Sequence, residues 1–217
     1  ITKENRPEWN ICDIGAGQIG AVTVPIYPTI SPSEYEYIFN DASIKLAFVG
    51  QGDLISKVRT AYINVDSLED IYTIDRQDGE KYWEDIFAEG DLSEVEALKA
   101  AAKPDDLVTL IYTSGTTGKP KGVMISFEAM AVAAKGVADA LNMKDTDRML
   151  SYLPLAHVFE RYAIEQASLN IGFHVFFADE LIAIIVVKAH KVISIFIYEQ
   201  VFKFFLFCFV HLLILFR

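Results

Sequence analysis

Residues 107–122 read LVTLIYTSGTTGKPKG, an apolar run that leads directly into a loop of hydroxyl-bearing residues, glycines and lysines. The apolar part, residues 107–112, predicts a strand that is buried on both faces, because almost every side chain in it is apolar. The run that follows has little side-chain bulk and many hydrogen-bond donors. A buried strand followed by such a loop is typical of the places where α/β proteins bind anions.

The loop predicts a phosphate-binding site. Its three glycines permit close approaches that a side chain would prevent, so that peptide N–H groups can point toward an anion. Its two lysines bring positive charge to the same turn, and each charge-assisted hydrogen bond is worth roughly 1.5–3 kcal/mol. Three or four such bonds support an affinity of about micromolar to millimolar, as is ordinary for nucleotides. The residues expected to bind phosphate are Thr113, Ser114, Gly115, Thr116, Thr117, Gly118, Lys119 and Lys121.

This loop differs from the Walker motif, in which four residues separate the glycines and Ser or Thr follows the lysine. Here two residues separate Gly115 from Gly118, and Pro120 follows Lys119. The alternative is a flexible surface loop rich in glycine and threonine. The full run, which starts from an apolar strand, favours phosphate binding over that alternative.

The composition limits the class of protein. The net charge of −11 argues against a nucleic-acid surface, which needs clustered lysine and arginine. Apolar residues make up 52% of the 217 residues, which indicates a globular protein of one domain or slightly more. Cys12 and Cys208 are too few and too distant for a disulfide framework or a metal site. Because no basic and apolar leader is recognised, we expect a cytoplasmic location.

The charge pattern changes near residue 180. Residues 1–180 carry 15 Lys and Arg and 29 Asp and Glu, whereas residues 181–217 carry four Lys and Arg and one Glu. We therefore expect a partial domain over 1–180 and an apolar tail over 181–217. A frameshift in an AT-rich gene and a membrane anchor both explain the tail. Residues 204–216 are interrupted by His211 and are shorter than the roughly 20 residues needed to cross a bilayer, so no spanning helix is expected.

Strand and helix patterns alternate along the chain, which predicts an α/β fold with a mostly parallel sheet. A helix is predicted from Pro7 through Gln18, because Trp9, Ile11, Ile14 and Ile19 recur at roughly helical spacing. In a helix that starts at residue 31, the aromatic residues Tyr35, Tyr37 and Phe39 are expected to pack in the core and at the surface. Further helices are predicted over 53–63, 82–87, 93–102, 127–141 and from about 154 to 172, and strands over 22–26, 45–49, 71–74, 107–112, 123–126, 149–153 and 173–177.

Four segments, in this order, resemble a known family. They are NRPEW at 5–9, GAVTVPIYPT at 20–29, YTSGTTGKPKG at 112–122 and SYLPLAHVFER at 151–161. The chain is similar to the adenylate-forming (AMP-binding) superfamily and, within it, to the long-chain acyl-CoA synthetases, over residues 1 to about 180. The resemblance implies part of the large N-terminal domain of these enzymes, a layered α/β/α structure.

The resemblance also implies a two-step reaction on small-molecule substrates. A carboxylate attacks the α-phosphate of Mg·ATP, pyrophosphate leaves, and coenzyme A then takes the acyl group. The loop would hold the β- and γ-phosphates, with Thr116 near Mg²⁺, and His157 would line the substrate tunnel. Taken by itself, His157 fits equally well as a packing residue at a helix start. For Glu160 and Arg161, a solvated pair or a structural bridge is favoured over catalysis.

Other parts of the family pattern are not found before Arg217. These are a glutamate that serves magnesium, an aspartate that holds the ribose, and a C-terminal lid domain with a catalytic lysine. We therefore expect the parent enzyme to be a long-chain fatty acid–CoA ligase, and this chain alone to be inactive. A non-catalytic nucleotide-binding remnant and a ligase for another carboxylic acid are the alternatives. Peripheral membrane association would suit an enzyme of fatty acids.

Overall fold

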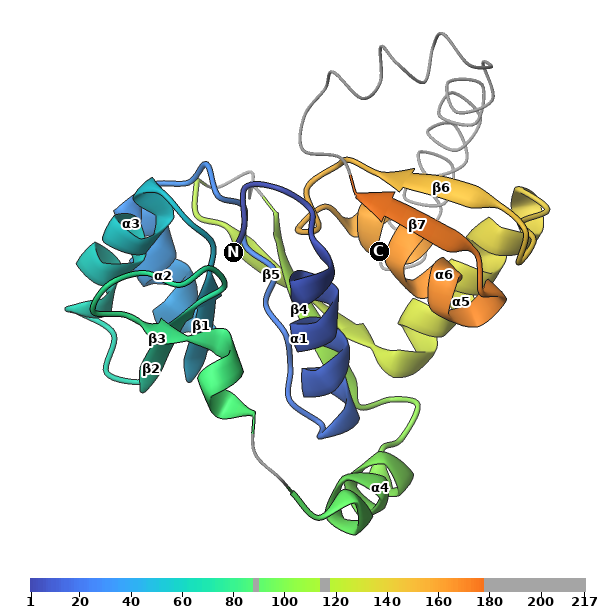
Figure 1. The fold of residues 1–217 in the computed structure, drawn as a ribbon, viewed down its shortest axis with the longest axis horizontal. Helices are drawn as coiled ribbons and strands as arrows, with labels where there is room; N and C mark the ends of the chain where they lie inside the picture. The colour runs from blue at the N-terminus through green and yellow to red at the C-terminus, as the bar shows by residue number, and fades with distance from the viewer. Residues whose placement is uncertain (88–89, 114–117, 178–217) are drawn as a thin grey trace, which may run out of the picture.

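The computed structural model describes residues 1–87, 90–113 and 118–177. Within them, helices and strands alternate and form three groups, which Figure 1 shows from left to right as a first lobe, a central hairpin with a helix beside it, and a second lobe. This arrangement confirms the mixed α/β fold. The division of the chain near residue 180 and the two explanations of residues 181–217 fall outside the described residues and stay predictions.

The first group, here called the apolar lobe, has a three-stranded parallel sheet in the order β1-β2-β3. Helices α2 and α3 pack on each other and on this sheet, and their inward side chains are fully buried, among them Phe39, Leu54 and Val58. Each such side chain contributes about 1.5–3 kcal/mol relative to exposure. The elements are α2 (Pro32–Asp41), β1 (Leu46–Val49), α3 (Asp53–Tyr62), β2 (Asp70–Thr73), β3 (Lys81–Tyr82) and the 3-10 helix η1 (Trp83–Ile86).

Helix α2 begins where the sequence predicts it, because its first turn is capped. The Ser31 hydroxyl accepts a hydrogen bond from the Glu34 N–H, and the Glu34 carboxylate accepts one from the Ser31 N–H at 2.9 Å. Pro32 occupies the first helical position, where a missing N–H costs nothing. This reciprocal cap satisfies two backbone donors and fixes the start of the helix. As expected, Tyr35 and Phe39 of this helix belong to the core.

The central group is an antiparallel hairpin with a helix beside it. Strands β4 and β5 pair from Leu107 opposite Ser126 to Thr113 opposite Lys121, with an irregularity between Leu107 and Thr109. The predicted strand over 22–26 forms only an isolated parallel bridge, between Thr23 and Thr109. The elements are α1 (Pro7–Gln18), β4 (Leu107–Thr113) and β5 (Lys121–Ser126), and α4 (Leu92–Ala101) lies below them in Figure 1.

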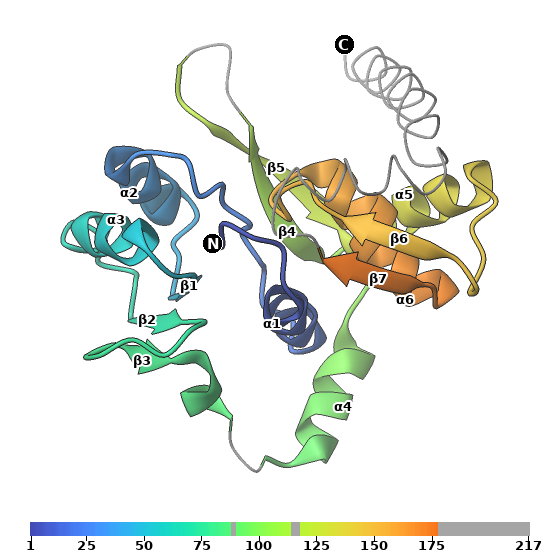
Figure 2. The ribbon, with the colours of Figure 1, turned by 45° about the horizontal axis from the view of Figure 1, so that its top comes forward.

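The second lobe is a parallel strand pair with helices on one face, as Figure 2 shows. Strands β6 and β7 pair from Arg148 opposite His174 to Ser151 opposite Phe177. The helix expected to end near residue 172 does so, and Gly172 ends it with φ of 90°, a conformation that suits glycine. The elements are α5 (Phe127–Ala140), β6 (Arg148–Ser151), the π-helix η2 (Glu160–Gln166), α6 (Ala167–Ile171) and β7 (His174–Phe177).

Helix α1 forms where it is predicted, but the apolar residues at helical spacing are not its buried face. Ile11 and Ile19 are about half exposed, whereas Asp13 is buried. The reason is that α1 lies against groups that a charged side chain can pair with, and Asp13 faces the guanidinium of Arg161 from the second lobe. Helical spacing identifies the helix correctly but does not show which of its faces is buried.

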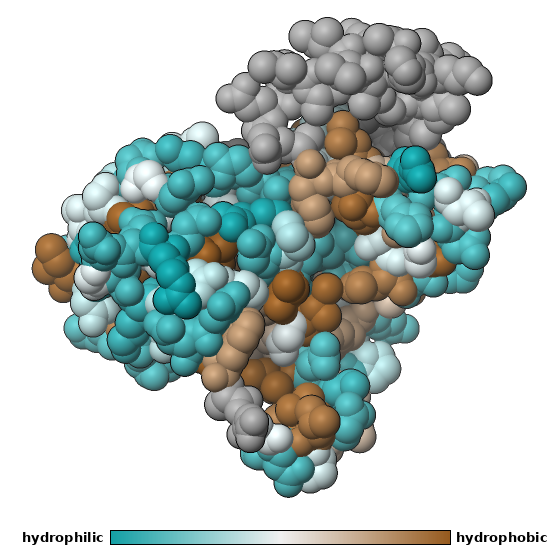
Figure 3. Space-filling view, in the orientation of Figure 1, coloured by the Kyte–Doolittle hydropathy of each residue, from teal (hydrophilic) through white to brown (hydrophobic). Residues whose placement is uncertain are grey.

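Apolar side chains gather on the surface over α1 and α4, as the brown atoms in Figure 3 show. Helix α4 buries none of its residues. Of the residues that the structure describes, none lies in a helix long and apolar enough to cross a bilayer. The exposed apolar residues of this region are Ile11, Ile19, Val22, Ile86, Phe87, Leu92 and Leu98.

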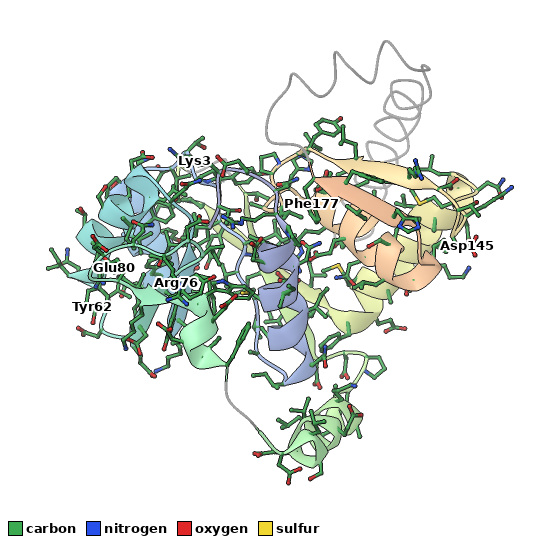
Figure 4. The ribbon with its side chains drawn as sticks, in the orientation of Figure 1. Lys3, Tyr62, Arg76, Glu80, Asp145 and Phe177 are labelled. Atoms are coloured by element: carbon green, nitrogen blue, oxygen red, sulfur yellow. The ribbon has the colours of Figure 1, made fainter. Side chains whose placement is uncertain are left out.

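The outer side of the apolar lobe is polar. Tyr62 and Glu80 lie there, on the side of α3 and β3 away from α1 (Figure 4). Arg59 pairs with Glu80, and Lys81 pairs with Asp70. Because these lysine and arginine side chains already have carboxylate partners, this surface has no excess of positive charge to attract an anion.

Candidate functional site

The predicted phosphate loop lies at the end of the β4–β5 hairpin. Thr113 is the last residue of β4 and Lys121 the first of β5, and the two are opposite each other in the ladder. Strand β5 therefore starts two residues earlier than residue 123, where the sequence predicts it. The β4–β5 ladder reaches the loop from both sides, so Thr113 and Lys121, the first and last residues of the loop, are held by backbone pairing. Ser114, Gly115, Thr116 and Thr117 lie outside the described residues.

Gly118 and Lys119 are the described residues nearest to the loop centre. Gly118 has φ of +91°, a backbone conformation that residues with a side chain rarely adopt. The Lys119 ammonium lies 5.2 Å from the centre of the Tyr37 ring, which comes from α2. Among the described residues, neither Lys119 nor Lys121 is within ion-pairing distance of a carboxylate. The positive charge at this turn is therefore not neutralised by those residues.

Tyr112 packs flat against the opposite strand. A Cβ built on Gly122 would lie 3.1 Å from the ring carbon Cζ of Tyr112, closer than a real Cβ tolerates without movement. The Tyr112 hydroxyl donates a hydrogen bond of 2.6 Å to Asp41 Oδ2 of α2. Burial, with the Asp41 carboxylate as second cause, raises the pKa of Tyr112. This tyrosine therefore stays a neutral donor and joins the hairpin to the apolar lobe.

The described part of the loop fits an anion. Two lysines that have no carboxylate partner in the described part of the chain, the exposed Thr113 and a glycine in the left-handed region stand at one hairpin end. A dianionic or trianionic phosphate group would find charge-assisted donors there. For a metal ion the described residues offer less, because none of their His, Cys, Asp and Glu side chains gather in groups of three that could hold one. Thr116, expected near Mg²⁺, lies outside the described residues.

His157 lies after β6, in the turn that enters η2. Its Nδ1 accepts a hydrogen bond of 3.2 Å from the Phe159 N–H, so the ring proton of the neutral imidazole resides on Nε2. Burial lowers the pKa of His157. Within the described part of the chain, His157 makes no hydrogen bond to Thr113, Lys119 or Lys121. The structure therefore shows His157 as a residue that caps the start of a helix and leaves one N–H group available.

Arg161 forms a buried bridge between the second lobe and α1. It is fully buried, and its Nη2 donates to Asp13 Oδ2 at 2.6 Å. Its Nη1 lies 3.4 Å from Thr109 Oγ1 of β4, and its guanidinium lies over the Trp9 ring at 5.3 Å. The expectation of a structural bridge is therefore confirmed for Arg161, and its partner is Asp13. The sequence did not indicate this partner.

Two further carboxyl groups are buried beside this bridge. Glu165 Oε2 is 3.5 Å from Arg161 Nε, without hydrogen-bond geometry, and burial together with Asp13 raises the pKa of Glu165 to about 8. Asp13 makes the shorter contact with Arg161, at 2.6 Å against 3.5 Å for Glu165, and is the carboxylate that hydrogen-bonds to the guanidinium. Burial likewise raises the pKa of Glu160 to about 7, against the effect of its hydrogen bonds. Asp13, Glu160, Arg161 and Glu165 are here called the charged seam.

The segment before His157 is held by the N-terminal residues. Asn5 donates from Nδ2 to Ser151 Oγ at 2.8 Å and to the Leu153 carbonyl at 2.6 Å. Together with the pairing of Asp13 and Arg161, these contacts join residues about 150 positions apart. Asn5, Asp13 and Glu165 thus help to hold these segments in place, and the sequence analysis did not identify them. The spacing of four between Arg161 and Glu165 is the one local signal that pointed to a pair.

The fold and the four segments together are those of the class of adenylate-forming α/β proteins. The chain matches the AMP-binding enzyme family over residues 1–206 and therefore belongs to that family.

Curated relatives are long-chain acyl-CoA synthetases. The chain is 31% identical to long chain acyl-CoA synthetase 5 of Arabidopsis thaliana, over 77% of this chain and 27% of the relative. It is 33% identical to the long-chain-fatty-acid–CoA ligase FadD15 of Mycobacterium bovis, over 83% of this chain and 31% of the relative. The chain thus spans a quarter to a third of the length of these relatives.

Among solved structures, the anthranilate CoA ligase AuaEII in complex with anthranoyl-AMP matches the fold. The TM-score is 0.65 at 23% identity, and the match covers 80% of this chain and 34% of that structure. At this identity the likeness supports the fold alone. The expected fold class, part of an adenylate-forming domain, is confirmed by these matches.

Proposed function

We propose that the protein derives from an ATP-dependent ligase that activates a long-chain fatty acid as its acyl-adenylate and transfers the acyl group to coenzyme A. Membership of the AMP-binding family and relatives of this activity at about 31–33% identity support the proposal. The observation that carries it is the hairpin end, where Lys119 and Lys121 stand without carboxylate partners among the described residues.

The first step requires charge neutralisation above all. An oxygen of the fatty acid carboxylate forms a bond to the α-phosphorus of ATP, and the bond from that phosphorus to the bridging oxygen of pyrophosphate breaks. The leaving pyrophosphate accumulates negative charge, which lysine and hydroxyl donors stabilise. In this proposal Thr113, Gly118, Lys119 and Lys121 hold the β- and γ-phosphates together with residues 114–117. Mg²⁺ bound to the phosphates would supply further positive charge.

His157 would act at the substrate side of the same reaction. Because Nδ1 is occupied by the Phe159 N–H, the neutral imidazole presents its Nε2–H to any ligand. The lowered pKa keeps this histidine neutral at physiological pH. A neutral N–H donor suits a carboxylate or thioester oxygen and adds no permanent charge. We assign His157 to substrate contact on this basis and on the resemblance of its segment to the family.

The first test measures binding of inorganic pyrophosphate to the 217-residue chain by calorimetry. We expect wild-type binding in about the micromolar to millimolar range. Lys119→Ala, alone or combined with Thr116→Ala, should weaken it by tenfold or more, since a charge-assisted bond is worth roughly 1.5–3 kcal/mol. Lys135→Ala is the matched control, because Lys135 is an exposed lysine on α5. Equal binding by Lys119→Ala and wild type would refute the loop assignment.

The second test concerns the acid and the turnover. ATP–pyrophosphate exchange is measured with magnesium and a panel of long-chain, short-chain and aromatic acids. For an enzyme of the relatives' length that carries this segment, we expect the highest exchange with long-chain acids. For the 217-residue chain alone we expect binding without exchange. Highest exchange with an aromatic acid would favour a ligase for another carboxylic acid. Exchange catalysed by the 217-residue polypeptide alone would show that the parts of the relatives outside this segment are dispensable.

A further inference from the structure

Two side chains of α2, one helical turn apart, contact the base of the phosphate loop. The Tyr37 ring lies under the ammonium of Lys119 at 5.2 Å, and the Asp41 carboxylate accepts the hydrogen bond of 2.6 Å from Tyr112. Positions four apart lie on the same face of a helix, so both contacts come from one face of α2. Figures 1 and 2 both place the loop end of the hairpin on the side of α2. One helix thus contacts both sides of the loop.

This helix is a rigid support. Its N-terminus has the reciprocal cap of Ser31 and Glu34, and Tyr35 and Phe39 anchor it in the core of the apolar lobe. Tyr37 is partly buried against that same core. The side chain that contacts Lys119 is therefore fixed by the apolar lobe, independently of the loop. A contact from such a support can restrict a flexible side chain.

The hairpin is also fixed where it meets α2. Tyr112 is opposite Gly122 in the ladder, and its ring occupies the space where a side chain at Gly122 would stand. Its hydroxyl is bonded to Asp41 at the same time. Lys119 is therefore attached to a strand end whose position relative to α2 is set.

An aromatic partner suits a lysine that has to bind phosphate. A carboxylate at the position of Tyr37 would neutralise the ammonium and compete with an anion, whereas a ring attracts the cation and leaves its charge and its N–H groups in place. A free lysine also loses side-chain entropy when a ligand fixes it, and a ring contact that already restricts it reduces that loss. The contact thus prepares the ammonium without consuming it.

We propose that Tyr37 is a positioning residue for Lys119, which keeps the ammonium directed to bound pyrophosphate and stays in contact with it in the complex. Asp41 supports this arrangement through Tyr112. The proposal rests on the proposed function, since it assigns a role to Lys119 that only phosphate binding uses. It assigns to α2, far from the loop in sequence, a share in a site that the loop motif alone does not include.

The test is a double-mutant cycle on the 217-residue chain, with the dissociation constant for inorganic pyrophosphate as readout. Tyr37→Leu should weaken binding about fivefold, as loss of one cation–π contact implies. Tyr37→Phe, which keeps the ring, should bind within twofold of wild type, and Tyr37→Trp at least as tightly as wild type. In a Lys119→Ala background, Tyr37→Leu should cause no further loss, because Tyr37 acts through that lysine. Thermal unfolding checks that each variant is folded.

The outcomes separate the two proposals. If wild type does not bind pyrophosphate, the proposed function fails and the role of Tyr37 fails with it. If wild type binds and Lys119→Ala weakens binding but Tyr37→Leu does not, only the positioning role is overturned. A loss caused by Tyr37→Leu that is equally large without Lys119 would also overturn it, because that result indicates a general structural effect. Should Tyr37→Leu not fold, the dissociation constants of Tyr37→Phe and Tyr37→Trp decide whether the ring contact matters. Weaker binding by Tyr37→Trp than by wild type would then overturn the positioning role.

Discussion

The apolar lobe and the charged seam are both buried, yet different forces hold them together. In the lobe, Leu54 and Val58 are fully buried among other apolar side chains, and their contribution is the transfer of hydrocarbon out of water. In the seam, Arg161 is as deeply buried but carries a charge, and it depends on Asp13 for compensation. The difference teaches that a substitution in the lobe costs only the contacts of the side chain that is removed. In the seam, removing one partner also leaves the other partner buried without compensation.

The largest effect is expected from Arg161→Ala, which leaves the Asp13 carboxylate buried without its partner. Removing one member of a buried pair costs about 3–5 kcal/mol of unfolding free energy, since an uncompensated charge remains. Urea unfolding followed by circular dichroism measures it. The control is Lys135→Ala, which breaks the exposed pair with Asp139 and should leave the midpoint unchanged. A loss below about 1 kcal/mol for Arg161→Ala would show that the seam does not hold α1 in place.

A somewhat smaller effect is expected from Leu54→Ala in the apolar lobe. This side chain is fully buried on α3, and its truncation removes hydrocarbon and leaves a cavity, at a cost of about 3 kcal/mol. The matched control is Leu92→Ala on α4, where the leucine is 78% exposed and the helix buries nothing. The same urea titration compares them. Equal midpoints for the two variants would contradict the view that the lobe is the hydrophobic core of this region.

The smallest effect, and the one that distinguishes the two regions by mechanism, is a pH dependence. Burial raises the pKa of Glu160 to about 7, so the folded state holds a proton that the unfolded state releases above about pH 4.5. Stability from this group is therefore fully present below the unfolded pKa and is lost as pH rises toward 7. Between pH 5.5 and 7 the loss should be about 1–2 kcal/mol.

Glu160→Gln provides the comparison for this slope. Glutamine does not titrate, so over the same pH interval the variant should lose about 1–2 kcal/mol less stability than wild type does, which is the share of Glu160. The remaining slope should come from Glu165, whose pKa is raised to about 8 by burial and Asp13. Leu54→Ala is predicted to shift the whole curve downward without changing its slope. Identical slopes for wild type and Glu160→Gln would show that Glu160 is ionised in the folded state at these pH values.

Much of the lobe could be predicted from the sequence, because local patterns determine it. The capping residues Ser31 and Glu34 mark the start of α2, and Leu54 and Val58 recur at helical spacing. The seam could not be predicted in this way. Asp13 in a helix pattern indicates an exposed face, and its partner Arg161 lies 148 positions away. Only the tertiary structure reveals that the charge is buried and paired.

The candidate site shows the same division. The residues of the loop, from Thr113 to Lys121, follow one another in the chain, and their glycines, hydroxyls and lysines indicate an anion without further information. The contributions of Tyr37 and Asp41 come from a helix about 75 positions earlier and have no local signature. Sequence patterns identify groups that bind a ligand more readily than groups that hold those groups in position.

The separation of 148 residues between Asp13 and Arg161 also has a consequence during synthesis. A ribosome that adds about 5–20 residues per second synthesises Asp13 roughly 7–30 s before it synthesises Arg161. Throughout that interval the aspartate is hydrated, and α1 lacks the contact that later fixes it. The apolar lobe, whose buried core residues lie within residues 26–71 apart from Tyr112, can form in the meantime. Helix α1 is therefore expected to dock on Arg161 after the apolar lobe has formed.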